Sequence, residues 1–418
     1  MRVVAAGSPI YAHTVNATPF LAGLAARSVE VHQAVATPLL DVVPEGVGAW
    51  DTGPAPDFGP GGGGRVAEVG RRYSWLVDDA RTRVGAVRKV LERLTPDLVL
   101  TDSLGYAAAL AAEQVGLPWV SFGDGPLHFP DRRTPPFGAG LPYRTPAPWV
   151  WRNVVVQAAS RHVVMAAPQR RYAELRASLG LPARDVPVLE ACLSPHLHLH
   201  CGVPELEYPR ERLPEHVRFV GALRPPEPPG WAAPSWWERV VEQHPGQVVL
   251  VTQGTLRDDS AEVLRPALHL LLESGRAGVL TTGAADPASL TASAPDLGAG
   301  GGSVAVESFV PYGRVLPHAG AFVTNGGWTG VLLALAHGVP VVQVGRTEEK
   351  ADIGRRVEWA GAGLHVPAPG RDGRALRRAL DAVLGDPAYR EGARRLAAAL
   401  ARHDPPREGA ELMLGLRA

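Results

Sequence analysis

The sequence predicts an α/β protein of two domains, each built on a parallel β-sheet. Apolar, β-rich segments alternate along the chain with Ala- and Leu-rich helical segments, which is the pattern of a parallel sheet covered by helices on both faces. This alternation occurs in two series, and a Pro-rich stretch separates them. The length of 418 residues suits two domains of ordinary size, each with a substantial hydrophobic core.

The first series of strands assigns residues 1–205 to an N-terminal domain. We expect its strands at apolar runs bounded by turn residues: Val3–Ala6, Val29–Val35, Leu98–Thr101 and Trp119–Phe122. Between the second and third of these runs, Asp51 to Arg65 contains the glycine run Gly61–Gly64 and is expected to form a loop.

Residues 206–234 are expected to link the two domains, because prolines are frequent there and periodic apolar residues are few. The second series of strands then assigns residues 235–385 to a C-terminal domain. Its expected strands are Val248–Thr252, Gly278–Thr281, Val304–Val306, Phe322–Thr324 and Val341–Val344. The last residues, 386–418, begin with an amphipathic segment, from about Asp386 to Arg402, that predicts a helix.

The composition argues against several classes of function. Acidic and basic residues balance at 42 each, so no excess charge points to nucleic acid or to an anionic membrane surface. No apolar run is long enough to span a bilayer, and the N-terminus lacks the full apolar core of a signal peptide. The two cysteines are too few for a disulfide scaffold. We expect a cytoplasmic protein without a nucleic-acid or integral-membrane partner, and we leave open whether it forms a homodimer.

A glycine turn in the second series is the first candidate binding site. The expected strand Ala321–Thr324 leads into Asn325, Gly326 and Gly327, and a helical pattern follows from Trp328 to about His337. A glycine turn at the start of a helix binds anions well, because free backbone N–H groups point at the ligand and the helix dipole favours negative charge. An ordinary crossover between strands would give the same local pattern, so the turn alone is weak support.

The longer segment from 309 to 367 is far more specific. It resembles the nucleotide-sugar-binding signature of family 1 glycosyltransferases, the UDP-glycosyltransferase-like enzymes. The matching positions are Phe309-Val310-Pro311, Leu316-Pro317, Ala319, Val323-Thr324, Gly326-Gly327, Gly338-Val339-Pro340, Arg356-Val357 and Gly361-Ala362-Gly363. The resemblance implies the GT-B fold, in which two Rossmann-like domains with parallel sheets face each other across a cleft. It also implies that residues 1–205 bind the acceptor, that residues 235–385 bind the nucleotide sugar, and that a helix within 386–418 packs back on the N-terminal domain.

The chain departs from the family pattern at four places. Asn325 stands where the family has a His, and Tyr312 where it has a Gln. The hydroxyl residue of the phosphate turn falls on Gly330, with Thr329 beside it. Glu349-Lys350 replaces the Asp-Gln pair that reads sugar hydroxyls. These departures leave the nucleotide, UDP or dTDP, and the sugar open.

The resemblance assigns a catalytic base to His13 and an orienting partner to Asp102. His13 follows the first strand and Asp102 ends another, and doubly wound folds bind ligands at such strand ends. A histidine near neutrality can take a proton from a hydroxyl, and an aspartate can fix its tautomer. His13 in a loop without a role, or Asp102 as the N-cap of the next helix, would be the structural alternatives.

The donor is expected to bind the C-terminal domain at two glycine turns. The second turn contains Gly254 and Thr255, and the resemblance places Val310 against the nucleobase. The full set of expected donor contacts is Gly254, Thr255, Val310, Asn325, Gly326, Gly327, Trp328, Thr329, Glu349 and Lys350. No metal and no cofactor beyond the nucleotide sugar are expected, because backbone N–H groups and side-chain donors can stabilise the leaving diphosphate.

A cluster of Cys and His residues suggests a metal site at first sight. It consists of Cys192, His196, His198, His200 and Cys201. On one strand, however, the first and last of the three histidines lie roughly 13 Å apart, too far for one metal ion. We therefore favour a strand with Leu197 and Leu199 in the core over a zinc site.

Aromatic residues in the first domain suggest a wall for a flat or macrocyclic acceptor. They are Trp75, Phe122, His128, Phe137, Tyr143, Trp149 and Trp151. The leading hypothesis is an inverting, metal-independent glycosyltransferase that moves a sugar from a nucleoside-diphosphate sugar to a small-molecule aglycone in secondary-metabolite or antibiotic biosynthesis. A non-catalytic sugar-nucleotide-binding accessory protein and a sugar-nucleotide epimerase of the same fold remain as alternatives. His13 and Asp102 argue against the accessory protein, and no further acid/base residues for an epimerase are identifiable.

Overall fold

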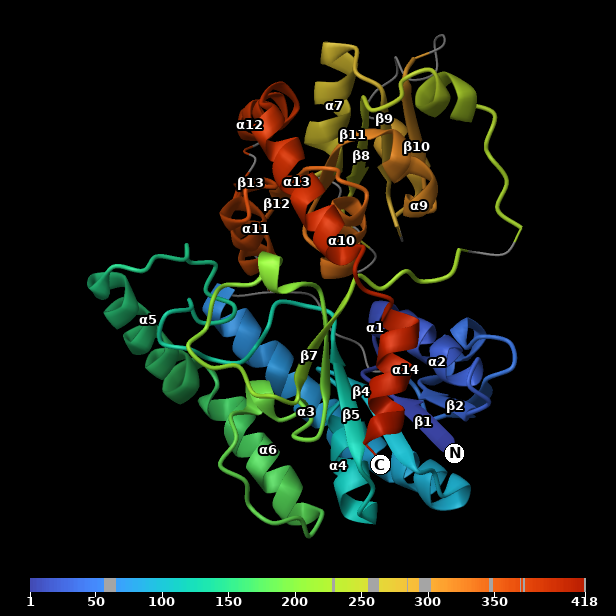
Figure 1. The fold of residues 1–418 in the computed structure, drawn as a ribbon, viewed down its shortest axis with the longest axis vertical. Coiled ribbons are helices and arrows are strands. Elements are labelled where there is room, and N and C mark those ends of the chain that lie inside the picture. Colours follow the sequence, from blue (N-terminus) through green and yellow to red (C-terminus); the bar gives the residue numbers. More distant parts are fainter. Residues whose placement is uncertain are drawn as a thin grey trace.

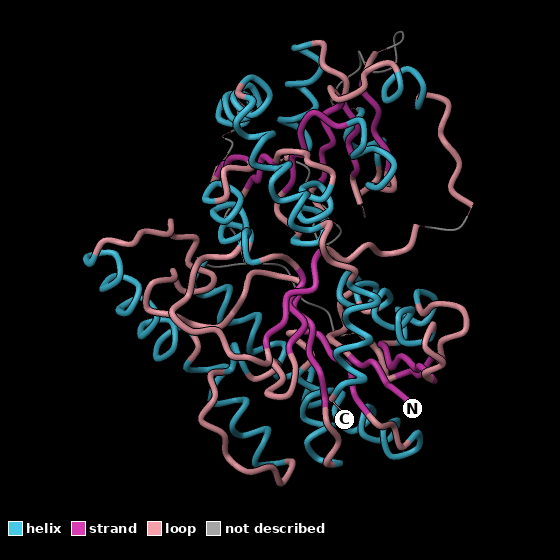
Figure 2. Tube along the Cα trace, viewed as in Figure 1, coloured by secondary structure: helices cyan, strands magenta, loops and turns pink. Residues whose placement is uncertain are grey.

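The computed structural model describes residues 1–55, 65–227, 230–254, 263–283, 285–292, 302–345, 349–368, 370 and 373–416. These residues form two α/β halves stacked along the long axis of the molecule, with the first half at the bottom of the view in Figure 1. Each half contains one sheet, and the two groups of strands stand apart in Figure 2. All described strand pairs within both sheets are parallel, which confirms the predicted α/β class.

The first sheet has seven strands in the order β3-β2-β1-β4-β5-β6-β7. They are β1 Arg2–Ala6, β2 Glu30–Val35, β3 Gly48–Asp51, β4 Leu98–Asp102, β5 Trp119–Gly123, β6 His198–Cys201 and β7 Val217–Gly221. β1 lies between β2 and β4, so the order of strands reverses there. The carboxyl ends of β1 and β4 therefore frame a crevice at the point where such folds bind ligands.

The second sheet has six strands in the order β10-β9-β8-β11-β12-β13. They are β8 Val248–Thr252, β9 Gly278–Thr281, β10 Val304–Glu307, β11 Ala319–Thr324, β12 Val341–Val344 and β13 Gly363–Val366. Here the order reverses between β8 and β11. Valine and leucine side chains of the central strands are completely buried, as expected for strands covered by helices on both faces.

Helices cover both sheets. Those of the first half are α1 Tyr11–Asn16, α2 Thr18–Ala25, α3 Arg65–Leu94, α4 Tyr106–Val115, α5 Ala147–Ala159 and α6 Ala166–Ser178. Those that follow are α7 Leu264–Ser274, α8 Pro287–Thr291, α9 Tyr312–Val315, α10 Trp328–Ala336, α11 Lys350–Trp359, α12 Arg374–Gly385, α13 Pro387–Leu400 and α14 Pro405–Gly415. Short 3-10 segments lie at Thr37–Val42, Val188–Glu190, Pro204–Leu206 and Leu316–His318, and π-helical turns at Ser160–Val164 and Glu238–Glu242.

All strands predicted from the two series are present, but the predicted linker at 206–234 needs a correction. β7 lies inside it and pairs with β6 in the first sheet, so the chain leaves that sheet only after Gly221. The surrounding prolines concealed this strand at the edge of the sheet. β3 and β13, each four residues long, were also missed. The loop expected at 51–65 falls mostly on residues outside the described part of the chain. The other domain boundaries stay a prediction.

The C-terminal segment returns to the first half through its last helix. α13 packs on α10 in the second half, whereas α14 packs on α2, beside which it lies in Figure 1. A Cβ on Gly23 would meet the Pro406 carbonyl oxygen at 1.9 Å, and one on Gly409 would meet the Phe20 ring at 2.5 Å. The two glycines therefore allow α2 and α14 to approach closely. The return predicted for 386–418 is made through α14, and α13 adds a smaller contact to residues 204–206.

A buried ion cluster joins the halves beside the cleft. Arg356 of α11 lies 3.0 Å from the Glu207 carboxylate, measured from Nε to Oε2, and Arg210 contacts the same oxygen at 3.3 Å. One turn earlier, the Asp352 carboxylate accepts hydrogen bonds from the backbone N–H groups of Gly138 and Gly140. α11 thus ties the second half to the segment around residue 138, which walls the cavity described next.

Candidate active site

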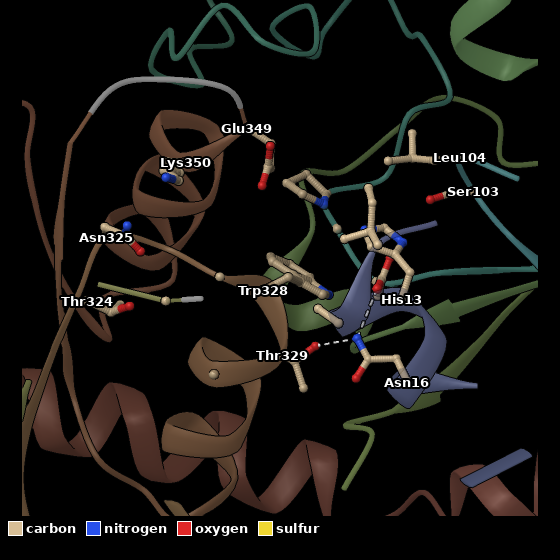
Figure 3. A pocket seen from close by; sticks show the side chains of 18 of the residues that line it. His13, Asn16, Ser103, Leu104, Thr324, Asn325, Trp328, Thr329, Glu349 and Lys350 are labelled. Atoms are coloured by element: carbon tan, nitrogen blue, oxygen red, sulfur yellow. Dashed lines mark hydrogen bonds and ion pairs between the residues drawn. The ribbon is translucent and has the colours of Figure 1, made fainter. Parts of the chain in front are cut away.

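A cavity of about 340 Å³ lies between the halves, at the crevice that the strand order predicts. Residues of α1, α3 and the segment after β5 line it from the first half. The ends of β8 and β11 and the starts of α10 and α11 line it from the second. Figure 3 shows side chains of both halves pointing into this space, among them His13, Asn16, Trp328 and Glu349.

The structure brings His13 and Asp102 together. His13 lies in α1, rather than in the loop expected from the sequence, and its Nδ1 atom is 3.3 Å from Oδ1 of Asp102, the last residue of β4. Asp102 also accepts backbone hydrogen bonds from Ser8 at 2.6 Å and Leu104 at 2.7 Å. A Cβ at Gly7 would stand 2.3 Å from the Asp102 carboxylate, so the glycine makes room for it. The carboxylate is therefore held in one orientation toward the imidazole.

A second carboxylate, which the sequence analysis missed, also faces His13. Asp124 follows β5, and its Oδ1 atom lies 3.2 Å from His13 Nδ1. The positional rule that singled out Asp102 at the carboxyl end of β4 applies equally to the polar residue after β5 and would have found it. His13, Asp102 and Asp124 together are called the base cluster below.

Burial and the mutual charges of the base cluster shift the pKa values of all three residues. Burial lowers the pKa of His13, but the charges of Asp124 and Asp102 outweigh burial and raise it to about 9. Burial alone would raise the pKa of Asp102, yet His13 and the two backbone donors lower it below its usual range. Burial raises the pKa of Asp124, and the neighbouring Asp102 charge adds to this effect.

The glycine turn, residues 325–327, joins β11 to α10 as predicted. Gly326 has φ +95°, and a Cβ there would stand 2.6 Å from the Gln343 side-chain nitrogen. That amide donates to the backbone oxygen of Asn325 at 3.1 Å, and the Asn325 side chain donates to the backbone oxygen of Gln253. Gly327 differs, because nothing lies within 4 Å of its Cβ position and its φ is −69°. The turn is therefore held from behind at Gly326 and open toward the cavity at Gly327.

The other predicted donor residues take different positions. Gly254, Thr329, Glu349 and Lys350 line the cavity, and Lys350 is buried at the first position of α11. Three further predicted residues are placed as follows. Trp328 also lines the cavity, although its indole N–H donates to the Cys201 carbonyl at 2.6 Å. The Val310 side chain is fully buried in the core. Thr255 lies outside the described residues.

Comparisons with known proteins decide the family. Residues 288–416 match the family model "Erythromycin biosynthesis protein CIII-like, C-terminal domain". The chain is 36% identical over 342 residues to 4'-demethylrebeccamycin synthase of Lentzea aerocolonigenes, covering 82% of this chain and 79% of that protein. The chain is a family 1 glycosyltransferase. The enzyme therefore transfers a sugar from a nucleoside-diphosphate sugar, and it is of the natural-product type.

Solved structures confirm the predicted GT-B fold of the glycosyltransferase. It superposes on the calicheamicin glycosyltransferase CalG4 with a TM-score of 0.71 at 22% identity, covering 99% of this chain and 97% of that one. It superposes on glycosyltransferase VinC in complex with dTDP with a TM-score of 0.70 at 19% identity, covering 100% of both chains. None of the described helices combines the length and apolar character needed to cross a bilayer.

The predicted acceptor aromatics separate into three groups in the glycosyltransferase. His128 and Phe137 line the cavity, with ring centroids 4.0 Å apart. Phe122 belongs to the core, and Trp151 is 70% exposed on α5. Tyr73 of α3 lines the cavity and was missed. Helical periodicity marks the buried face of α3, but only the packed structure shows which part of that face meets the cavity.

The Cys and His cluster forms part of the core. Leu197 and Leu199 are buried in the large hydrophobic cluster, which confirms the prediction. His198 and His200 are buried in β6, whereas His196 precedes the strand and is exposed. Burial lowers the pKa of His200 to about 4, so it is neutral near pH 7. Within the described part of the chain, no three His, Cys, Asp or Glu side chains are arranged to hold a metal ion.

Proposed function

We propose that this glycosyltransferase inverts the anomeric carbon of its donor in a single displacement, with His13 as the general base and Asp102 as its orienting partner. One observation carries the proposal: the His13 imidazole, 3.3 Å from the buried Asp102 carboxylate, lines the same cavity as the glycine turn of the opposite half. A base on one wall and a diphosphate site on the other suit attack from the face opposite the leaving group.

The proposed step moves one proton and one sugar. The acceptor hydroxyl gives its proton to His13 Nε2, because Nδ1 faces the carboxylates. The acceptor oxygen forms a bond to the anomeric carbon, and the bond from that carbon to the diphosphate oxygen breaks. The nucleoside diphosphate leaves with the electron pair. Asp102 stabilises the imidazolium that forms and keeps Nδ1 protonated.

The donor diphosphate is proposed to bind at the start of α10, at Gly327 and Thr329, with Gly254 on the neighbouring turn. The open side of Gly327 lets backbone N–H groups approach a phosphate, and the helix dipole adds attraction. No divalent metal is needed in this arrangement. The nucleobase would lie against the backbone at Val310. VinC, bound to dTDP, supports a dTDP sugar as donor, and a UDP sugar is the alternative.

Glu349 and Lys350 are proposed to read the sugar hydroxyls, because both line the cavity at the start of α11. The acceptor is proposed to lie against Tyr73, His128 and Phe137, whose rings suit a flat aromatic or macrocyclic small molecule. The name 4'-demethylrebeccamycin synthase supports a natural-product acceptor. We also propose that the enzyme acts in the cytoplasm, which cell fractionation would test.

The test of the function is acceptor-dependent release of nucleoside diphosphate. The enzyme is incubated with dTDP-glucose or UDP-glucose and a panel of aromatic and macrocyclic aglycones, and the anomeric configuration of the product is read by NMR. We expect release only with an acceptor, an inverted product, and loss of turnover in His13→Gln but not in His269→Gln, a control on the exposed face of α7. Retention of configuration, or full turnover in His13→Gln, would refute the mechanism.

A further inference from the structure

Two carboxylates, rather than one, share the Nδ1 atom of His13. The distance to Asp124 Oδ1 is 3.2 Å and that to Asp102 Oδ1 is 3.3 Å. Both acids are almost fully buried, with 4% of the Asp124 side chain and 1% of the Asp102 side chain exposed. Nδ1 is thus within ion-pair distance of both carboxylates, although it makes a hydrogen bond to neither of them in this structure. A simple pair of base and orienting acid needs only one of them, so the second carboxylate calls for an explanation.

Asp124 is held in place by a side chain of the same helix as the base. Asn16, in the last turn of α1, donates from Nδ2 to Asp124 Oδ2 at 2.9 Å. The same nitrogen donates to the Thr329 hydroxyl at 2.9 Å, and this contact crosses the cleft to the second residue of α10, as Figure 3 shows. Asn16 is 3% exposed, so the donating amide is itself buried at the edge of the cavity. The orientation of the Asp124 carboxylate therefore depends, through Asn16, on the position of α10 in the second half.

The two acids have different surroundings. Asp102 receives backbone hydrogen bonds from Ser8 and Leu104, which stabilise its negative charge. Asp124 receives the Asn16 amide and is buried beside another carboxylate, and both burial and the Asp102 charge disfavour its ionised form. A positive imidazolium between them is what allows both acids to be ionised at once. The charge of each acid is consequently coupled to the protonation of His13.

From this geometry we propose that Asp124, aimed by Asn16, is a second positioning carboxylate that fixes the His13 ring and raises its strength as a base. The proposal rests on the proposed function of His13. With two carboxylates within ion-pair distance of Nδ1, a turn of the ring would move Nδ1 away from both charges, so Nε2 stays directed at the cavity. The second negative charge also stabilises the imidazolium that forms when the acceptor hydroxyl loses its proton.

Other titratable groups also face the cluster. Glu349, just before α11, raises the pKa of His13 to a smaller extent than the two aspartates. Cys201 at the end of β6 lies near Asp124, and Cys192 lies near Asp102. Burial raises the pKa of both thiols well above the usual value, so they are neutral near pH 7. Among these groups, only Glu349 adds a further charge near His13, and it comes from the second half.

The test is a direct titration of His13 in the intact enzyme. Histidine is labelled with ¹³C at Cε1, and the His13 signal is assigned by its absence in His13→Gln. We expect wild-type His13 to titrate near 9, as its surroundings indicate, and Asp124→Asn to lower that pKa by roughly 1–3 units. Glu190→Gln is the matched control, since it removes a carboxyl group outside the base cluster and should leave the His13 titration unchanged. An unchanged His13 pKa in Asp124→Asn overturns the proposal.

A second variant keeps the proposal testable if Asp124→Asn does not fold, which thermal unfolding would reveal. Asn16→Ala leaves the carboxyl group in place but removes the amide that aims it, and it should lower the His13 pKa by a smaller amount. If the Asn16→Ala titration matches that of the wild type, Asn16 does not aim the acid and the proposal fails.

The pH profile of kcat/KM separates this proposal from the proposed function. The base must be neutral to accept a proton, so kcat/KM rises with pH up to the His13 pKa. In Asp124→Asn this rise, the acidic limb of the profile, should shift to lower pH, and the plateau value of kcat/KM should be lower. If the NMR titration moves and the acidic limb does not, Asp124 tunes His13 but His13 is not the base, and the proposed function fails. If the NMR titration stays fixed, the role of Asp124 fails whatever the activity shows.

Discussion

Replacing one glycine of the turn at residues 325–327 should abolish nucleotide binding without harming the fold. Gly327 has extended backbone angles, φ −69° and ψ 128°, which a β-branched residue adopts readily. No atom lies within 4 Å of a Cβ at this position, so the side chain of Gly327→Val enters open space. That space is where the diphosphate is proposed to approach the backbone of α10. The variant should therefore melt close to the wild type.

The cost to binding follows from the hydrogen bonds that a phosphate would make there. Bonds to a charged group contribute about 1.5–3 kcal/mol each. Blocking two backbone donors at the start of α10 then costs about 3–6 kcal/mol, which is more than about 100-fold in Kd. Calorimetric titration with dTDP and UDP would measure this loss. Wild-type affinity in Gly327→Val would refute the placement of the diphosphate.

The neighbouring glycine provides the matched control, because it should fail for the opposite reason. Gly326 has φ +95°, where an alanine costs about 1–2 kcal/mol. A Cβ there would also stand 2.6 Å from the Gln343 amide, which donates to the backbone oxygens of Asn325 and Val344. Disturbing these buried bonds adds about 1–3 kcal/mol. Gly326→Ala should therefore lower the melting temperature by several degrees, a shift that Gly327→Val should not show.

The remaining predictions concern the base, the sugar and the joint between the halves. His13→Gln should lower kcat by about 100-fold or more while the Kd for dTDP stays unchanged. Asp102→Asn should lower turnover and leave the fold intact. Steady-state kinetics and calorimetry measure both variants. Glu349→Ala should strongly impair use of the donor. Lys350→Gln should change the ratio of rates between a fully hydroxylated and a deoxygenated donor, because lysine only donates hydrogen bonds. A constant ratio in both variants would show that neither residue contacts the sugar hydroxyls. Burial opposes ionisation of Glu207, but its arginine partners lower the pKa from the usual 4.5 to about 2. The ion cluster therefore stabilises the fold fully at pH values above the usual glutamate pKa of 4.5, and this contribution is lost as the pH falls toward about 2. Glu207→Gln should lower the free energy of unfolding by about 3–5 kcal/mol at pH 7 and by less at pH 3, as measured by urea unfolding.

The sequence by itself determined the α/β class, most of the strands, the glycine turn and the positions of His13 and Asp102. These features depend on short-range patterns, because a buried parallel strand is a run of apolar residues and a turn before a helix needs glycine. The carboxyl ends of parallel strands meet at one edge of a sheet, so residues that end different strands can be expected near each other. This rule places Asp102 and the segment that follows β1 at the same edge, and the packing of α1 then brings His13 to 3.3 Å from Asp102.

The tertiary structure decided what joins distant parts of the chain. Asn16 and Thr329 are 313 positions apart and come into contact only because the halves close on each other. The same closure places Asp352 of α11 on the backbone of Gly138 and Gly140. Asp124 stands at a strand end, but its distance from the imidazole depends on how α1 packs over the first sheet. Contacts of this kind depend on how rigid elements pack in three dimensions, and local sequence patterns carry no record of that packing.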